Sequence, residues 1–228
     1  QAAVAAAGSG ARVFLAEPRT YLGADLCATL RLHPGSDRES EITLLARRLF
    51  PDGRKTTPLR VKKELDRALL DAGVDFLFGC YATDLLVDGQ GRAAGVVLAD
   101  RNGVQAVGAK TVIDATPRAR LARSAGCGQT PWPDGPVAFE RTVLQPGRDG
   151  APEEVVHSLS MHLPDGSVRS LSEAEQRARD ETYEPGQLRS ADSLFFVPPD
   201  PIMCERSTGE WTGPDSADLG HFRAGDVG

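Results

Sequence analysis

Apolar and polar residues follow two different patterns along the first part of the chain, one typical of a helix and one typical of a strand. Residues 1–7 are mostly alanine, which has high helix propensity, and the Gly-Ser-Gly that follows can end a helix. Residues 12–17 contain a short apolar run with β-branched and aromatic members, the pattern of a buried strand. Pro18 cannot continue a central strand, so we expect this strand to end at Glu17.

A second helix and strand follow in the same order. Thr57 can cap a helix that has Pro58 in its first turn, and Gly73 ends it. Its apolar stripe consists of Val61, Leu65 and Leu69. Residues 74–78 then predict another buried strand, which we expect to join the sheet of the first. Between the two units, residues 40–50 indicate a short helix and Pro51-Asp52-Gly53 a turn.

Turn residues mark an antiparallel region over residues 81–109. Asn102-Gly103 is the strongest hairpin signal in the chain because both positions accept positive φ. Residues 110–116 predict a further buried strand, stopped by Pro117, and residues 118–125 a helix. The fold class predicted for this part is α/β, a Rossmann-like sheet with an inserted antiparallel β-meander.

The character of the chain changes from Gly128 onward, where proline and glycine become frequent. Residues 137–144 and 155–163 indicate strands of a second sheet, and residues 194–197 a short one. Ser172 and Glu175 form a capping-box pattern that predicts a helix to about residue 182. We therefore expect two domains, 1–127 and 128–228, the second mixed, loop-rich and partly irregular.

Composition excludes several classes of protein. The 228 residues are 40% hydrophobic and 25% charged, which is ordinary for a globular protein. A net charge of −6 disfavours nucleic-acid binding, and no apolar run is long enough to span a membrane. The four cysteines show no Cys-x-x-Cys spacing, and the spacing of His157 and His162 is not that of metal ligands, so we expect reduced thiols and no metal.

The acid at the end of the first strand indicates what these elements bind. A helix, a glycine turn, a strand and Glu17 at the strand's carboxyl end form half of a unit that binds a dinucleotide through its ribose. The glycine-rich phosphate loop of such a unit stands about 20 residues before the acid. We therefore expect the chain to begin immediately after that loop.

These pieces, in this order, resemble the FAD-dependent oxidoreductases with two dinucleotide-binding domains over roughly residues 1–126. The resemblance implies that Glu17 takes the adenosine ribose hydroxyls and that FAD is the cofactor. It also implies further cofactor-binding residues, which are Arg19 and Ala82 near the adenine, Gly23 on the flavin side, and Ala115 and Thr116 at a backbone that passes close to FAD.

Four departures from the family pattern limit what the resemblance implies. Ala24 stands where a second glycine is usual, and Pro117 replaces the glycine that normally follows Asp-Ala-Thr. Cys27 has no partner cysteine nearby, so a disulfide reductase is not expected. The late Gly225-Asp226 pair follows a stretch too polar for the strand that the family's second acid motif needs.

The sequence thus predicts a flavoprotein that transfers hydride or electrons between FAD and a small organic molecule, with residues 128–228 on the substrate side. Two alternatives stay open, an NAD-dependent dehydrogenase and a non-catalytic binding module built on a nucleotide fold. The sequence identifies no catalytic acid or base, substrate, electron acceptor, oligomeric state or compartment.

Overall fold

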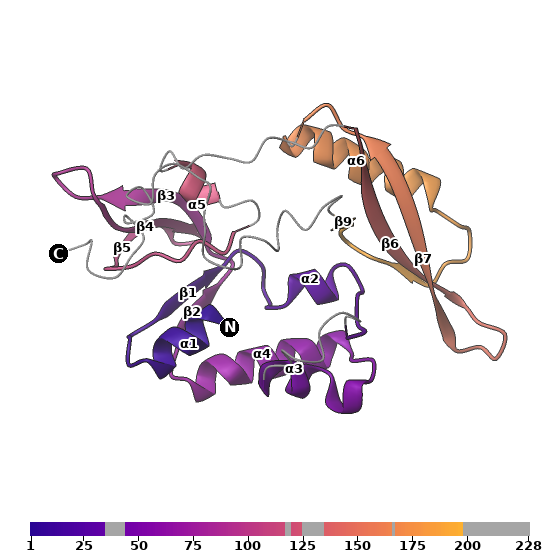
Figure 1. The fold of residues 1–228 in the computed structure, drawn as a ribbon, viewed down its shortest axis with the longest axis horizontal. Coiled ribbons are helices and arrows are strands. Elements are labelled where there is room, and N and C mark those ends of the chain that lie inside the picture. Colours follow the sequence, from indigo (N-terminus) through magenta and orange to yellow (C-terminus); the bar gives the residue numbers. More distant parts are fainter. Residues whose placement is uncertain (35–43, 117–119, 125–134, 166, 198–228) are drawn as a thin grey trace. The chain divides into compact units, whose positions relative to one another are not determined.

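A computed structural model describes residues 1–34, 44–116, 120–124, 135–165 and 167–197 (Figure 1). Its contacts divide the chain into two compact units. Among the described residues, unit 1 comprises 1–22, 64–116 and 120–124, and unit 2 comprises 23–34, 44–63, 135–165 and 167–197. The Gly225-Asp226 pair, Cys127 and Cys204 lie outside the described residues.

Unit 1 begins with the predicted helix and strand. Helix α1 (Ala2–Gly8) is followed by strand β1 (Phe14–Glu17), which ends at Glu17 as expected. Helix α4 (Pro58–Asp71), whose first residues belong to unit 2, leads to strand β2 (Asp75–Phe78). β1 and β2 pair in parallel, with Glu17 opposite Phe78. The prediction that the two strands share a sheet is confirmed.

The ends of α4 follow the chemistry of their residues. The Arg60 amide donates to Thr57 Oγ1 at 3.3 Å, and Gly73 has a φ of +68° just beyond the helix. Of the predicted stripe, Val61 and Leu69 are buried and Leu65 is half-buried, while the neighbouring Leu70 is exposed.

The two parallel strands are less buried than predicted. Phe14 is 42% exposed and Leu77 is 37% exposed. Parallel strands are buried when helices and further strands cover both faces. Among the described residues, the sheet of β1 has only β2 as a second strand. The apolar run therefore predicted the strand correctly but overestimated its burial.

The predicted antiparallel region is confirmed as a three-stranded meander. Strands β3 (Tyr81–Val87), β4 (Ala93–Asp100) and β5 (Gly103–Gly108) pair in that order. The Asp88 carboxylate closes the first turn by accepting from the amides of Gln90 and Arg92 at 2.8 and 2.9 Å. Helix α5 (Arg120–Ser124), within the predicted 118–125 helix, contacts β3.

The predicted strand over residues 110–116 is wrong. These residues form no strand, and Ile113 in the middle of the run is 59% exposed. A strand needs a neighbouring ladder, and polar side chains in this run bond the local backbone instead. The Asp114 carboxylate accepts from the Thr116 amide at 2.9 Å, a contact that competes with strand pairing.

Unit 2 is built around a second sheet. Strands β6 (Pro136–Pro146) and β7 (Pro152–His162) pair along their whole length, confirming the two predicted strands. On its other side β6 pairs with β8 (Arg189–Ser190) and β9 (Phe195–Val197). The described elements that precede this sheet in sequence include the short helices α2 (Ala24–Cys27) and α3 (Leu44–Leu49) and the 3-10 helix η2 (Pro51–Gly53).

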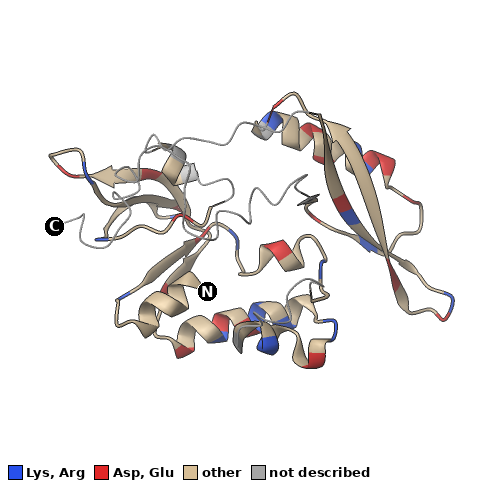
Figure 2. Ribbon diagram, viewed as in Figure 1, with Lys and Arg blue, Asp and Glu red and all other residues tan. Residues whose placement is uncertain are grey.

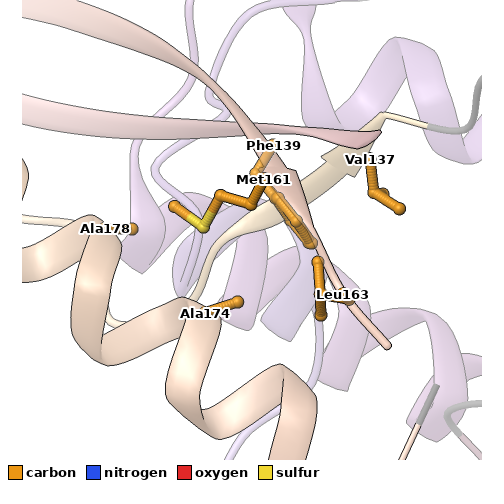
Figure 3. Close-up of a cluster of buried hydrophobic side chains, with 6 residues drawn as sticks. All are labelled: Val137, Phe139, Met161, Leu163, Ala174 and Ala178. Atoms are coloured by element: carbon orange, nitrogen blue, oxygen red, sulfur yellow. The ribbon is translucent and has the colours of Figure 1, made fainter. Parts of the chain in front are cut away.

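Helix α6 (Val168–Glu181) covers one face of this sheet. Figure 3 shows the contact, in which side chains of β6, the β7 end and α6 meet in one apolar cluster. The cluster consists of Val137, Phe139, Met161, Leu163, Ala174 and Ala178. Small alanines on the helix side allow α6 to approach the strands closely.

The predicted start of this helix is wrong. Ser167, rather than Ser172, is the N-cap and accepts from the Ser170 amide at 3.2 Å. The earlier start adds a turn that brings Leu171 against the apolar cluster. The exposed side of α6 carries both signs of charge (Figure 2), including the four-residue-spaced pairs Arg169–Glu173 and Arg179–Glu175. No helix in the described ranges has both the length and the apolar content needed to cross a membrane.

Candidate functional site

Glu17 stands at the carboxyl end of β1, the end at which open parallel sheets bind ligands. Its main-chain carbonyl accepts from the Cys80 amide at 3.1 Å, which ties the end of β1 to the start of β3. Its side-chain Oε1 accepts from the Arg19 amide at 2.9 Å. This bond folds the Pro18 turn back on the strand and orients the carboxylate.

The Glu17 carboxylate has acceptor positions that no described residue occupies. Within the described residues, Oε2 has no hydrogen-bond or ion-pair partner, and the side chain is half-buried. An ionised carboxylate has about four lone-pair positions, of which the Arg19 amide uses one. Two adjacent hydroxyls of a ribose are donors that match the remaining positions. The acceptor positions at this strand end thus fit the adjacent hydroxyls of a ribose.

Arg19 lies beside this carboxylate, on the connection between β1 and the rest of the unit. Its carbonyl accepts from the Gly79 amide at 3.1 Å, so the backbone after β1 is fixed to the backbone after β2. Its guanidinium is exposed, with Nη1 3.4 Å from the Tyr21 hydroxyl. A planar cation in this position can stack on an aromatic ring.

Ala82 lies near the same strand end. It is the second residue of β3, which contacts β1, and it pairs with Leu98 of β4. The pairing shifts register between Ala82 and Asp84, which marks a bulge at Thr83. Bulges turn the local backbone away from a regular ladder. The structure therefore brings Glu17, Arg19 and Ala82 together around the ends of β1 and β2.

Ala115 and Thr116 belong to a separate turn in the same unit. Asp114 organises it, since Oδ1 accepts from the Thr116 amide at 2.9 Å and from its hydroxyl at 2.7 Å. Asp114 Oδ2 accepts from the Ala122 amide of α5 at 2.9 Å. Because α5 contacts β3, this turn is connected to Ala82 through β3.

Gly23 belongs to unit 2, where it is the N-cap of α2. Its φ of +79° is a left-handed conformation that glycine adopts without steric cost. Its carbonyl accepts from the amides of Leu26 and Cys27 at 3.1 and 2.9 Å. The glycine is therefore required by the backbone at this point, whatever lies next to it.

Cys27 does not have the surroundings of a reactive thiol. It is buried and free, and its Sγ lies 3.7 Å from the Pro58 carbonyl oxygen. Burial raises the pKa of the Cys27 thiol, which keeps it protonated. Cys80, also buried and free, has its pKa raised for the same reason. Neither of these two cysteines is in a disulfide.

Sequence reasoning missed a group of charged side chains in unit 2. Glu154 of β7 pairs with His33 at 2.9 Å and with Lys55. Burial acts to raise the pKa of Glu154, but hydrogen bonds from Lys55 and His33 outweigh it and hold the pKa below its ordinary range. Nothing in the sequence signals this group because its members come from three distant segments. Within the described ranges, no three His, Cys, Asp or Glu residues form a metal site.

The fold is similar to those of solved proteins. A geranylgeranyl bacteriochlorophyll reductase-like protein of Thermoplasma acidophilum is 17% identical with a TM-score of 0.53, over 86% of this chain and 62% of that one. Aklavinone-11 hydroxylase, solved with FAD and aklavinone, is 14% identical with a TM-score of 0.48, over 86% of this chain and 50% of the hydroxylase. The chain thus spans less than two thirds of the Thermoplasma protein's length.

At these identities, the Thermoplasma structure shows similarity of fold alone, a mixed α/β arrangement with parallel and antiparallel sheets. No curated protein sequence matches the chain. The sequence profile of the FAD dependent oxidoreductases matches residues 1–132, more than half of the chain. These residues include Glu17, Arg19, Gly23, Ala82, Ala115 and Thr116. The chain belongs to the FAD-dependent oxidoreductase family, and FAD is the cofactor of that family.

Proposed function

We propose that this protein oxidises or reduces a small organic molecule by transfer of hydride or electrons to or from FAD. The observation that carries the proposal is the Glu17 carboxylate, held at the carboxyl end of a parallel strand with acceptor positions remaining. The family supplies the cofactor, and the strand end supplies a place for its ribose.

The finer architecture that we propose for unit 1 is Rossmann-like. The order β1, α4, β2 with parallel pairing is a β-α-β unit, whose second strand must return by a crossover connection. Helix α1 precedes β1, as a helix does between the first strand and the acidic strand of a dinucleotide-binding unit. The meander after β2 is an insertion typical of the flavoproteins that the sequence resembles.

Each predicted site residue then has a role in holding FAD. Glu17 accepts the adenosine ribose hydroxyls, and Arg19 and Ala82 border the adenine. Ala115 and Thr116 approach the cofactor through their backbone, in a turn fixed by Asp114. Gly23 lies on the flavin side. Bound FAD supplies the redox chemistry, while the chain binds and orients it.

We propose that residues 128–228 contribute the substrate side, through the face of the β6–β7 sheet that α6 does not cover. Side chains alternate between the two faces of a strand, and the odd-numbered residues of β6 face α6. The opposite face includes Ala138 and its partner Ser160, together with Ser158, all of them exposed. Such small side chains leave room above the sheet for a small molecule.

The experiment is to purify the whole protein, record its visible spectrum and identify any cofactor released on denaturation. The expected result is flavin absorbance that bleaches on reduction, with FAD as the released molecule. A colourless protein that takes up no added FAD would overturn the proposal. Binding of NADH without flavin would support the dehydrogenase alternative, and binding of neither would support a non-catalytic module.

A further inference from the structure

Residues 23–32, called here the 23–32 segment, run from the proposed flavin side into the interior of unit 2. After α2 the chain is almost completely buried, with Arg31 the exception. The buried residues are Cys27, Ala28, Thr29, Leu30 and Leu32. A connecting segment normally runs over the surface, so this one is a structural part of unit 2.

Arg31 joins the segment to the sheet by two contacts. Its Nη1 lies 3.0 Å from Glu140 Oε2, and its guanidinium carbon lies 3.5 Å from the centre of the Phe195 ring. Glu140 on β6 and Phe195 on β9 are register partners, so the cation lies against two adjacent strands. Guanidinium is planar, so it can pair with a carboxylate and stack on a ring at once, which ammonium does less well.

Backbone hydrogen bonds fix the segment on either side of Arg31. The Ala28 carbonyl accepts from the Ser193 amide at 3.0 Å, just before β9. The Leu32 carbonyl accepts from the Thr56 amide at 2.8 Å. Arg31 thus holds the segment to the sheet, while backbone contacts with the residues before β9 and before α4 hold it on either side.

The backbone between these contacts is strained. Leu30 has a φ of +56°, in the left-handed region that residues with a Cβ rarely adopt. Such a conformation persists only when the surrounding contacts hold it, and it is often found at functional positions. Leu30 is buried and lies directly before Arg31, so the Arg31 contacts are well placed to maintain it.

We propose that Arg31 is a positioning residue that clamps the 23–32 segment to the β6–β9 edge and so fixes the backbone of the segment that begins at Gly23. The inference rests on the proposed function, because it takes Gly23 to lie on the flavin side. Glu140 is on the sheet face proposed for the substrate. Arg31 therefore joins the sheet proposed for the substrate to the segment that begins at Gly23.

The test compares Arg31→Met, which keeps the length of the side chain but not its charge, with Arg31→Lys. Arg169→Met is the control, because Arg169 makes an exposed ion pair on α6. The first readout is amide hydrogen exchange, in which Arg31→Met is expected to speed exchange of residues 27–32 roughly tenfold. The strands β6 and β7 should stay as protected as in the wild type.

The second readout is the visible spectrum and midpoint potential of bound FAD. Arg31→Met is expected to shift both at unchanged flavin stoichiometry, Arg31→Lys to shift them less, and the control not at all. Flavin properties equal to those of the wild type in Arg31→Met would overturn the proposal, even if exchange becomes faster. A wild-type protein that binds no flavin would overturn the proposed function and the role of Gly23, while the exchange experiment would still test the clamp.

If Arg31→Met does not fold, Glu140→Gln and Phe195→Leu each remove one partner and leave the arginine in place. Each is expected to give the same changes at smaller size, because one of the two contacts remains. Wild-type exchange and flavin properties in both variants would overturn the proposal.

Discussion

Two carboxylates of unit 1 differ in what their oxygens already bind. Asp114 uses both oxygens within the protein, on the Thr116 and Ala122 amides, so it serves the turn that leads into α5. Glu17 accepts from the Arg19 amide through one oxygen, and within the described residues its other oxygen has no hydrogen-bond partner. The apolar run and Pro18 were enough to predict where Glu17 lies. The partners of Arg31 were not predictable, because Glu140 stands 109 residues further along the chain.

A third carboxylate, Asp165, makes the start of α6 sensitive to pH. Hydrogen bonds from the hydroxyls of Ser167 and Ser170 and from the Ser167 amide lower its pKa from 3.8 to about 2. A lowered folded-state pKa gives stability that is present above the unfolded pKa and is lost as the pH falls towards the folded one. We therefore expect unit 2 to lose stability between pH 4 and pH 2 through this group.

Urea unfolding at several pH values, followed by circular dichroism, measures this effect. Asp165→Asn should remove part of the pH dependence in that window, since an amide does not titrate. The exposed Asp149→Asn, in the β6–β7 turn, is the matched control. Equal pH slopes for Asp165→Asn and the wild type would show that the α6 start does not respond in this way.

At the scale of elements, residues that act on their own backbone predicted helices and turns well. Features that depend on contacts with distant segments were not predicted. Helix α4 and the meander were predicted because Pro58, Gly73 and the Asn102-Gly103 pair act on their own backbone. The hairpin turn itself lies one residue earlier than that pair, at Arg101-Asn102, because Gly103 already pairs with Asp100. The strand expected over residues 110–116 failed because an apolar run needs a neighbouring strand that the sequence does not reveal. The start of α6 was missed because Ser167, rather than Ser172, caps the helix, and the added turn packs Leu171 against the apolar cluster.

The meander contains a position where only glycine fits. A Cβ on Gly95 would lie 2.0 Å from the Val107 carbonyl oxygen of β5, and its φ is +150°. Gly95→Ala is therefore expected to disrupt β4–β5 pairing and to lower the free energy of unfolding by about 1–3 kcal/mol.

Gly89→Ala is the control in the same meander, because its Cβ would meet nothing within 4 Å and its φ is not positive. Urea unfolding should show a change of less than about 0.5 kcal/mol for this variant. Equal stabilities of the two variants would mean that β5 can move away from β4 at little cost.

At the scale of the whole molecule, the order of elements was the informative signal. Helix, strand, acid, helix, strand and meander predicted the family, and the profile match over residues 1–132 confirms it. The association of Gly23–Lys63 with the second sheet was not predicted, because it depends on contacts such as Arg31–Glu140 between distant segments. The division into domains at residue 127 stays a prediction.

The central claim is that Glu17 binds the adenosine ribose of FAD, and FMN, which lacks adenosine, tests it directly. The measurement is the affinity of the whole protein for FAD and for FMN, in the wild type, in Glu17→Ala and in the exposed control Glu153→Ala. Hydrogen bonds to a charged group contribute about 1.5–3 kcal/mol, so Glu17→Ala should weaken FAD binding roughly 10- to 100-fold. Affinity for FMN should not change. Unchanged FAD affinity, or an equal loss for both flavins, would contradict the claim.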